Sequence, residues 1–493
     1  MEQYQWQAPP KPEHFPAGRK ELCFALCALV LALLSVNAFF YGGMNLVFTL
    51  GCMAGVAAVT VFLIKSQKRP TAYSVSLLVL SLVILAGFAR SDDSFVKLVL
   101  IGFVFVAVNL AITVFAGKNP DNGGSIRSVG YTLGAVFGSS LGGISQSMGG
   151  LFDSLRQGKG RNVLAVLGGL LIAVPVLLVL VPLLIKADAA FDGLMQLLPE
   201  FKFSELFVTV LFGGATAILV ISFNMSMLYD RQKPAQTGAF RGINPVTVCT
   251  VLIMVCGVYV LYLVSQLAYL SGGLAGILPE DFTLAEYARR GFFEMAMLCM
   301  VNLAVMVGTV ALIRKEKGVP GLCRWLCVFI GLITLFFVVS AAAKMGLYIQ
   351  GYGLTRLRIL TLVITAFLGL CALVLTLWLF VPKLPYMKII LLSALVIGAV
   401  VLWVDVDTVV ASYNVNAYLD GRLAHVDVKY LLTLSDGAVP YINLLRQAQD
   451  QQVAQRAMLE LLGRSCTRYK DIRGWNYASY VASKIIEAVK YGK

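Results

Sequence analysis

Long uninterrupted apolar stretches recur along this 493-residue chain between Leu22 and Val404, and they limit what it can fold into. Most of them reach the roughly 20 residues that a helix needs to cross the hydrocarbon core of a bilayer. Only 13% of the residues are charged, against about 25% in soluble domains, so the chain lacks the polar surface of a water-soluble protein. The stretches are continuous rather than alternating, which excludes the strand pattern of a membrane β-barrel.

We therefore predict an all-α fold: a polytopic transmembrane helical bundle of about 11 spans over residues 22–404, with a small C-terminal helical extramembrane domain. The predicted spans are Leu22–Phe40, Met44–Ile64, Ala72–Ala89, Leu98–Gly117, Val163–Ile185, Leu206–Leu228, Val246–Leu270, Gly291–Ile313, Trp325–Ile349, Ile359–Phe380 and Ile389–Val404.

The distribution of Lys and Arg between the predicted loops indicates an orientation. Cytoplasmic loops are enriched in these residues, and the two alternating sets of segments hold 20 and 8 of them. The richer set includes residues 1–21, a polar segment with four prolines and no signal-peptide core, which we expect to be a cytoplasmic tail. The C-terminal segment is then extracytoplasmic. The net charge of +14 is mainly a topology signal, and no basic stripe with interleaved aromatics indicates nucleic-acid binding.

The uncharged segment Ser128–Phe152 resembles a span but is rich in Gly and Ser. Its apolar residues recur in steps of three and four, which places one apolar stripe on a helix. We predict an amphipathic helix on the inner face over about residues 128–156, with a loosely helical loop packed on the bundle as the alternative. Ser140 and Ser147, opposite the stripe, are expected to be accessible from inside.

Residues 405–493 have the composition of an ordinary soluble segment, and their apolar residues recur at helical spacing. We predict a small helical domain there. Asp405 and Asp407 mark the exit from the last span, and with Asn414 and Asn416 they form the predicted bundle-to-domain junction. The two aspartates lie on different faces of a helix, which argues against paired-carboxylate catalysis.

Ionisable residues near the ends of three predicted spans form the main candidate site, because charges at membrane depth are costly and often functional. Arg290 and Glu294 are four residues apart and can pair on one helix face. Lys344 is expected to face Glu294 from the next span, unless it extends to the lipid headgroups. The cluster is interpreted either as structural pairing or as a binding or conduction site. Its members are Tyr287, Arg289, Arg290, Glu294, Lys344, Tyr348, Arg356 and Arg358.

Catalytic and metal-binding signatures are missing from the sequence. There is no phosphate loop, His-Glu-x-x-His motif or Gly-x-Ser-x-Gly elbow. The ten cysteines lie mostly in apolar runs and are expected to be small packing residues rather than a disulfide framework. With only His14 and His425, a histidine-based metal site is disfavoured. No catalytic residue, metal or cofactor is predicted, while Asn302 and two other asparagines within spans are expected to join helices.

The second half of the chain, from about Val246 to Lys493, contains three groups of motifs. They are Gln266–Leu270 with Leu278–Pro279 and Glu286–Glu294, then Lys344–Tyr348 with Tyr352–Arg358, and finally Tyr413–Asn416 with Val426–Leu431 and Leu434–Asp436. As a set they resemble the bacterial membrane family known as domain of unknown function 4173. The resemblance implies a bacterial cytoplasmic membrane protein and implies no activity.

Three functions compete. The chain is a transporter or permease for a small solute or lipid, a non-catalytic envelope or signalling protein whose C-terminal domain docks a partner, or a membrane enzyme acting on a lipid-linked substrate. A non-enzymatic role is favoured. Membrane lipid is the expected surrounding partner and nucleic acid is not, while the residues do not identify a small-molecule or protein partner.

Overall fold

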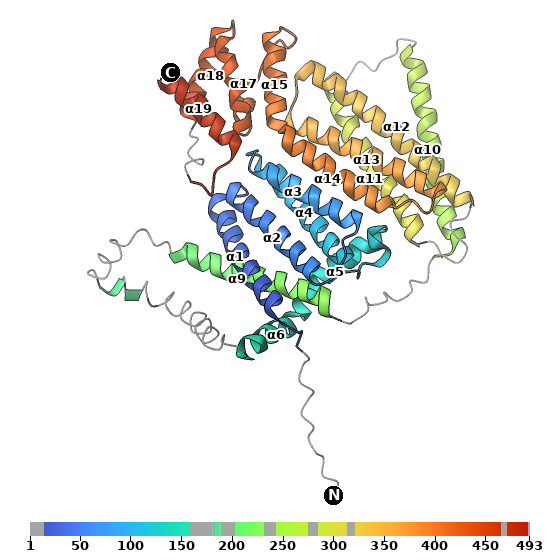
Figure 1. The fold of residues 1–493 in the computed structure, drawn as a ribbon. Coiled ribbons are helices and arrows are strands. Elements are labelled where there is room, and N and C mark those ends of the chain that lie inside the picture. Colours follow the sequence, from blue (N-terminus) through green and yellow to red (C-terminus); the bar gives the residue numbers. More distant parts are fainter. Residues whose placement is uncertain are drawn as a thin grey trace. The chain divides into compact units, whose positions relative to one another are not determined.

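The computed structural model describes residues 14–157, 180, 183–184, 186–188, 203–230, 243–274, 284–312, 321–464 and 471–491. These residues are mainly helical and form no β-sheet (Figure 1). The elements in chain order are α1 (Arg19–Gly42), α2 (Leu46–Lys65), α3 (Ala72–Phe88), α4 (Ser94–Phe115), η1 (Pro120–Gly123), α5 (Ile126–Gly142), α6 (Ile144–Gln157), α9 (Phe203–Tyr229), α10 (Pro245–Leu274), α11 (Leu284–Leu312), α12 (Gly321–Tyr352), α13 (Arg356–Phe380), α14 (Tyr386–Val404), α15 (Val406–Leu419), α16 (Val428–Leu432), η3 (Asp436–Ala438), α17 (Val439–Leu444), η4 (Leu445–Gln447), α18 (Gln451–Gly463) and α19 (Tyr477–Tyr491).

Nine of the described helices are long and apolar enough to cross a membrane, namely α1, α2, α4 and α9 to α14. Helices form here because a backbone in lipid must satisfy its own N–H and C=O groups. The predicted span at Ala72–Ala89 corresponds to α3, an apolar helix of 17 residues. The predicted span Val163–Ile185 lies outside the described residues, apart from three leucines.

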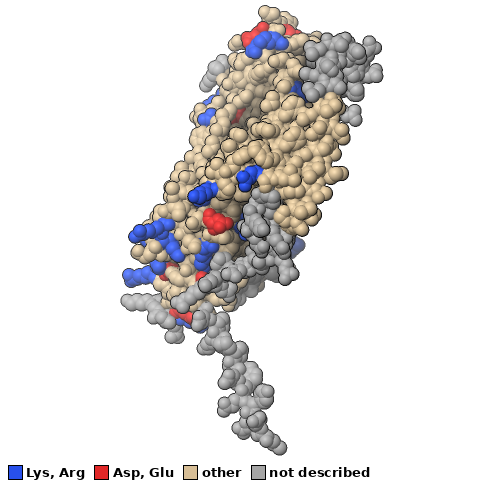
Figure 2. Space-filling model, turned by 90° about the vertical axis from the view of Figure 1, so that its right-hand side faces the viewer, with Lys and Arg blue, Asp and Glu red and all other residues tan. Residues whose placement is uncertain are grey.

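The surfaces of these helices carry large apolar side chains. Leu261 is 72% exposed and Val246 is 70% exposed, and many other large apolar side chains of these helices are exposed as well. Soluble monomers rarely expose large contiguous apolar patches. Figure 2 shows one face on which uncharged side chains form a broad surface with few charged side chains among them. The chain is therefore a multi-spanning membrane protein.

The chain divides into two compact units. The first consists of Met1–Arg90, Lys97–Pro234 and Thr467–Tyr477. In it α1 packs against α2 and α9, and the rings of Phe24 and Phe62 stack with centroids 4.2 Å apart.

The segment 471–477 is bound into this first unit by several contacts. The backbone N–H of Leu46 donates to the carbonyl of Trp475 (3.1 Å), and that of Tyr477 donates to the carbonyl of Ala89 (2.9 Å). Arg473 pairs with Glu205 of α9 at 3.1 Å.

The second unit consists of Ser91–Val96, Ala235–Cys466 and Ala478–Lys493. Within it α11, α12 and α13 pack against one another, and α15 packs against α17. Val410 and Val415 of α15 share a hydrophobic core with Leu354, which lies between α12 and α13, and with Ile486 of α19. The helices after residue 405 thus share one core with the ends of apolar helices, and a separate C-terminal domain from residue 405 stays a prediction.

The predicted amphipathic segment forms α5 and α6, and two of the serines on its polar side, Ser140 and Ser147, are buried. The hydroxyl of Ser222 on α9 donates to the carbonyl of Ser140 at 2.6 Å. Ser140 and Ser147 are 5% and 0% exposed, whereas Phe137 and Leu141 are 66% and 63% exposed. The expectation that the two serines are accessible is wrong, because small polar residues allow close helix contact while apolar side chains face lipid.

Candidate functional site

The first turns of α13 and α15 are joined by an ion pair. Thr355 caps α13 by accepting a hydrogen bond from the backbone N–H of Arg358 (3.3 Å), so Arg356 begins the helix. Nε of Arg356 donates to Oδ1 of Asp407 at 2.7 Å, and Nη2 donates to Oδ2. The backbone N–H of Ser435 also donates to Oδ2, at 2.7 Å. Asp407 is 0% exposed, and its charge is therefore compensated inside the protein.

A second buried carboxylate approaches the same guanidinium. Asp93 precedes α4, and its Oδ1 accepts hydrogen bonds from the backbone N–H groups of Phe95 (3.0 Å) and Val96 (3.1 Å), which is the geometry of a helix N-cap. Its Oδ2 lies 3.7 Å from Nε of Arg356. Asp93 is 4% exposed, so one guanidinium faces two buried carboxylates.

The third carboxylate lies where the last long apolar helix breaks. Asp405 separates α14 from α15 and has a φ of 58°, a backbone conformation that is uncommon outside glycine and less so for Asp and Asn. Its Oδ2 accepts a hydrogen bond from the hydroxyl of Thr408 at 2.8 Å. Its Oδ1 is buried, and none of the described residues donates a hydrogen bond to it.

The environment of Asp405 disfavours its negative charge. Burial raises the pKa of this carboxyl from 3.8 to about 6, and the charges of Asp407 and Asp93 act in the same direction, while hydrogen bonds from the hydroxyl of Thr408 and the backbone N–H of Asp407 oppose them. This group can therefore bind or release a proton under ordinary conditions. In the part of the chain that the structure describes, no group of three or more His, Cys, Asp or Glu residues is arranged to hold a metal ion.

The turn between α12 and α13 is clamped to the helices that follow α14. The side-chain amide of Asn414 donates to the carbonyl of Leu354 and accepts from its backbone N–H, both at 2.7 Å. The backbone N–H of Arg356 donates to the hydroxyl of Tyr430 at 2.7 Å. Of the four predicted junction residues, Asn414 thus bonds to this turn and Asp407 to Arg356 at the start of α13, whereas Asp405 is bonded to Thr408 of α15. Asn416 is exposed on α15 and donates to Ser412 of its own helix.

The predicted cluster of ionisable residues is divided between different partners. Arg356 pairs with Asp407 and Asp93. Arg358 donates to the backbone carbonyls of Tyr352 and Gly353, and its guanidinium lies 4.0 Å from the centre of the Tyr348 ring. The sequence offered no signal for the partners of Arg356, because Asp407 is 51 residues away and Asp93 is much further.

Glu294 and Lys344 lie on adjacent helices, α11 and α12, which pack against each other. Glu294 is exposed and Lys344 is half-buried, and the carboxylate attracts the ammonium group electrostatically. Their pairing stays a prediction. The side chains of Tyr287, Arg289 and Arg290 lie outside the described part of the structure.

A buried polar network joins α10, α11 and α12. Asn302 donates to the hydroxyl of Thr334 at 3.0 Å, and its carbonyl oxygen accepts a hydrogen bond from the hydroxyl of Tyr259. The surrounding residues are apolar. The network links three helices, which is the role expected for Asn302.

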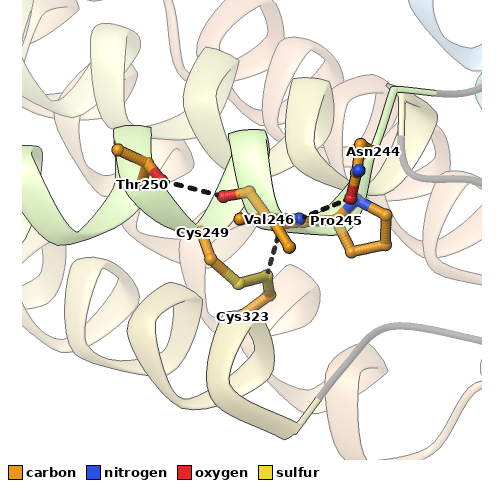
Figure 3. Close-up of a disulfide and its surroundings, with 6 residues drawn as sticks. All are labelled: Asn244, Pro245, Val246, Cys249, Thr250 and Cys323. Atoms are coloured by element: carbon orange, nitrogen blue, oxygen red, sulfur yellow. Dashed lines mark hydrogen bonds between the residues drawn. A yellow bond between two sulfur atoms is a disulfide. The ribbon is translucent and has the colours of Figure 1, made fainter.

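Cys249 and Cys323 form a disulfide, which the sequence reasoning missed. Figure 3 shows Cys323 on the first turn of α12 joined to Cys249 on the first turn of α10, close to Pro245. The expectation that the cysteines form no disulfide is wrong for this pair. The other described cysteines are free. The one available signal for this disulfide was position, since both cysteines lie near the starts of spans that follow predicted loops on the same side of the membrane.

Comparisons with known proteins give a family and no activity. No curated protein and no solved structure matches the chain. A family model does match, and it is not that of domain of unknown function 4173, the family that the motifs resemble. Because this match covers residues 74–445, well over half of the chain, the protein belongs to the family described as Domain of unknown function (DUF4153).

Proposed function

We propose that this protein is a transporter that moves a small solute or a lipid across the bacterial cytoplasmic membrane. The observation that supports this most is the buried acidic cluster at the break between α14 and α15, in which Asp407 and Asp93 face the guanidinium of Arg356 and Asp405 is a third, uncompensated carboxyl group. One aspartate per arginine would suffice for a structural ion pair, and further buried acid lowers stability. Buried ionisable groups at the ends of membrane helices are costly and often functional.

The proposal includes a topology of eleven spans with a cytoplasmic N-terminus and an extracytoplasmic C-terminus. It is supported by the 20-to-8 difference in basic residues between the two sets of segments. A reporter that is active only outside the cytoplasm should be inactive when fused after Lys118 and active when fused after Lys493. The opposite pattern at either position would contradict the topology.

The transport proposal is tested by isolating the full chain in native lipid nanodiscs and identifying the small molecules and lipids that accompany it. We expect one compound to be enriched relative to an unrelated membrane protein of the same host. That compound, supplied in labelled form, should enter proteoliposomes that contain the protein and should not enter empty liposomes. Enrichment without uptake would contradict a transport role.

A second candidate is a signalling or envelope protein that docks a partner through the helices after α14. It is favoured by the shared core of α15 with Leu354 and by the bonds from Asn414 to that residue. A partner bound to these helices would act directly on the turn between α12 and α13. Recovery of a stoichiometric protein partner from the nanodiscs, with no enriched small molecule, would select this candidate.

A further inference from the structure

We infer that Asp405 is a proton-binding site, in which Oδ1 of its carboxyl group takes up a proton from water and returns it to water. The inference goes beyond the proposed function, because proton occupancy of this group does not require transport. Asp405 is 7% exposed, and Oδ1 is a buried oxygen that no described residue supplies with a hydrogen bond. A buried anionic oxygen without a donor is strongly disfavoured, and binding a proton removes that cost.

The guanidinium of Arg356 is already paired with other carboxylates and does not neutralise a negative charge on Asp405. Arg356 of α13 is engaged by Asp407 of α15 and by Asp93 from the segment before α4. Both aspartates repel a negative charge on Asp405. Tyr430 of α16 accepts a hydrogen bond from the backbone of Arg356, and burial raises the pKa of its hydroxyl, so Tyr430 stays neutral.

The backbone of η3 packs directly against the carboxyl group of Asp405. A Cβ atom added at Gly437 would lie 2.1 Å from Oδ2 of Asp405 and 2.6 Å from the hydroxyl of Thr408. The neighbouring Asp436 is paired with Arg464 at 3.0 Å. The positive charge of Arg464 is therefore already neutralised by Asp436. A proton on Oδ1 remains the way to neutralise the carboxylate of Asp405.

A proton fits this site better than a metal ion. Hard metal cations in proteins take about six or more oxygen ligands. Here Oδ2 is held by Thr408, Oδ1 of Asp93 is used to cap α4, and both oxygens of Asp407 are bonded to Arg356. The pKa of Asp405 near 6 places the exchange in an accessible range of pH.

The test is infrared difference spectroscopy of the full chain in nanodiscs, titrated from about pH 4 to about pH 8, where exposed carboxyls are already ionised in the upper half of the range. We expect the absorption of a protonated carboxyl to be lost with a midpoint near pH 6. Asp405→Asn should remove this signal, and Asn is tolerated at positive φ. Asp420→Asn, which alters a carboxylate that is 59% exposed, should leave the signal unchanged.

Asp93→Asn gives a second readout. Asparagine caps a helix about as well as aspartate, so the fold is retained while one repelling charge is lost, and the midpoint should move to lower pH. Persistence of the signal in Asp405→Asn, or no carboxyl titrating above pH 5 in the wild type, would overturn the inference. A midpoint that moves when sodium or magnesium chloride replaces choline chloride would also overturn it, because the site would then bind a metal ion.

Thermal unfolding gives an independent measure with a defined sign. The folded pKa of Asp405 is raised above its ordinary value of 3.8, so its contribution to stability is present below that value and is lost as the pH rises through about 6. The melting temperature of the wild type should fall relative to Asp405→Asn over this interval. Parallel curves would contradict the inference.

Discussion

Replacing Arg356 by Gln tests how strongly the buried cluster depends on its one guanidinium. The change leaves Asp407, which is 0% exposed, with one remaining donor among the described residues, the backbone N–H of Ser435. Removing one partner of a buried ion pair typically costs about 3–5 kcal/mol. Because the Arg356 side chain is itself 30% exposed, water can replace part of the lost interaction. We therefore expect the lower end, about 3 kcal/mol of the free energy of unfolding.

The assay is reversible unfolding of the full chain in mixed detergent micelles, applied to a double-mutant cycle. Asp407→Asn should also destabilise, since it leaves Arg356 with only the weaker contact to Asp93 at 3.7 Å. The double variant should recover about 2 kcal/mol relative to the sum of the single losses. Arg422→Gln is the matched control, because its partner Asp420 is exposed, and it should change stability by less than about 1 kcal/mol. Single losses that add within about 0.5 kcal/mol would refute the coupling.

Three further outcomes follow from the described contacts. Glu294→Gln and Lys344→Met should each lower the melting temperature slightly, by the equivalent of about 1 kcal/mol or less, because Glu294 is exposed. The double variant should regain part of the loss, and simple additivity of the two losses would show that the groups do not pair. A cysteine at Ser140 should resist a membrane-impermeant maleimide, while a spin label at Phe137 should be relaxed by lipid-soluble oxygen, and rapid labelling at Ser140 would contradict the burial. Cys323→Ser removes a disulfide between residues 74 positions apart and should lower the free energy of unfolding by up to about 4 kcal/mol. Equal melting temperatures for the variant and the oxidised wild type would contradict this.

The helices were predictable because lipid imposes a strong local condition. A span must be apolar over about 20 consecutive residues, and this condition is visible without any knowledge of neighbours. The predicted span Ile389–Val404 accordingly corresponds to α14, which begins three residues earlier at Tyr386. The same condition does not determine which side of an amphipathic helix is buried. In α5 the serines pack inward, because the solvent outside the helix is expected to be lipid rather than water.

The partners within the candidate site were not predictable, since they depend on tertiary packing. Asp93 reads as an ordinary loop residue before a span, yet it caps α4 and also approaches Arg356. Asp405 and Asp407 were expected to end a helix and to contact the following domain. Their different roles, one compensated and one not, follow from which of them lies within reach of a guanidinium. The spacing of these residues in the sequence does not indicate which aspartate lies close to Arg356.

The two units exchange short pieces of chain, and this bears on how the protein is made. The first unit contains Thr467–Tyr477 from near the end of the chain, with Trp475 bonded to Leu46 and Arg473 paired with Glu205. During synthesis the N-terminal helices therefore reach the bilayer long before the segment that completes their packing leaves the ribosome. Until then the packing of these helices is incomplete, which makes them a natural target for membrane chaperones and quality-control proteases. A premature stop codon late in the gene would thus leave an unfinished N-terminal half, not merely a shorter C-terminus.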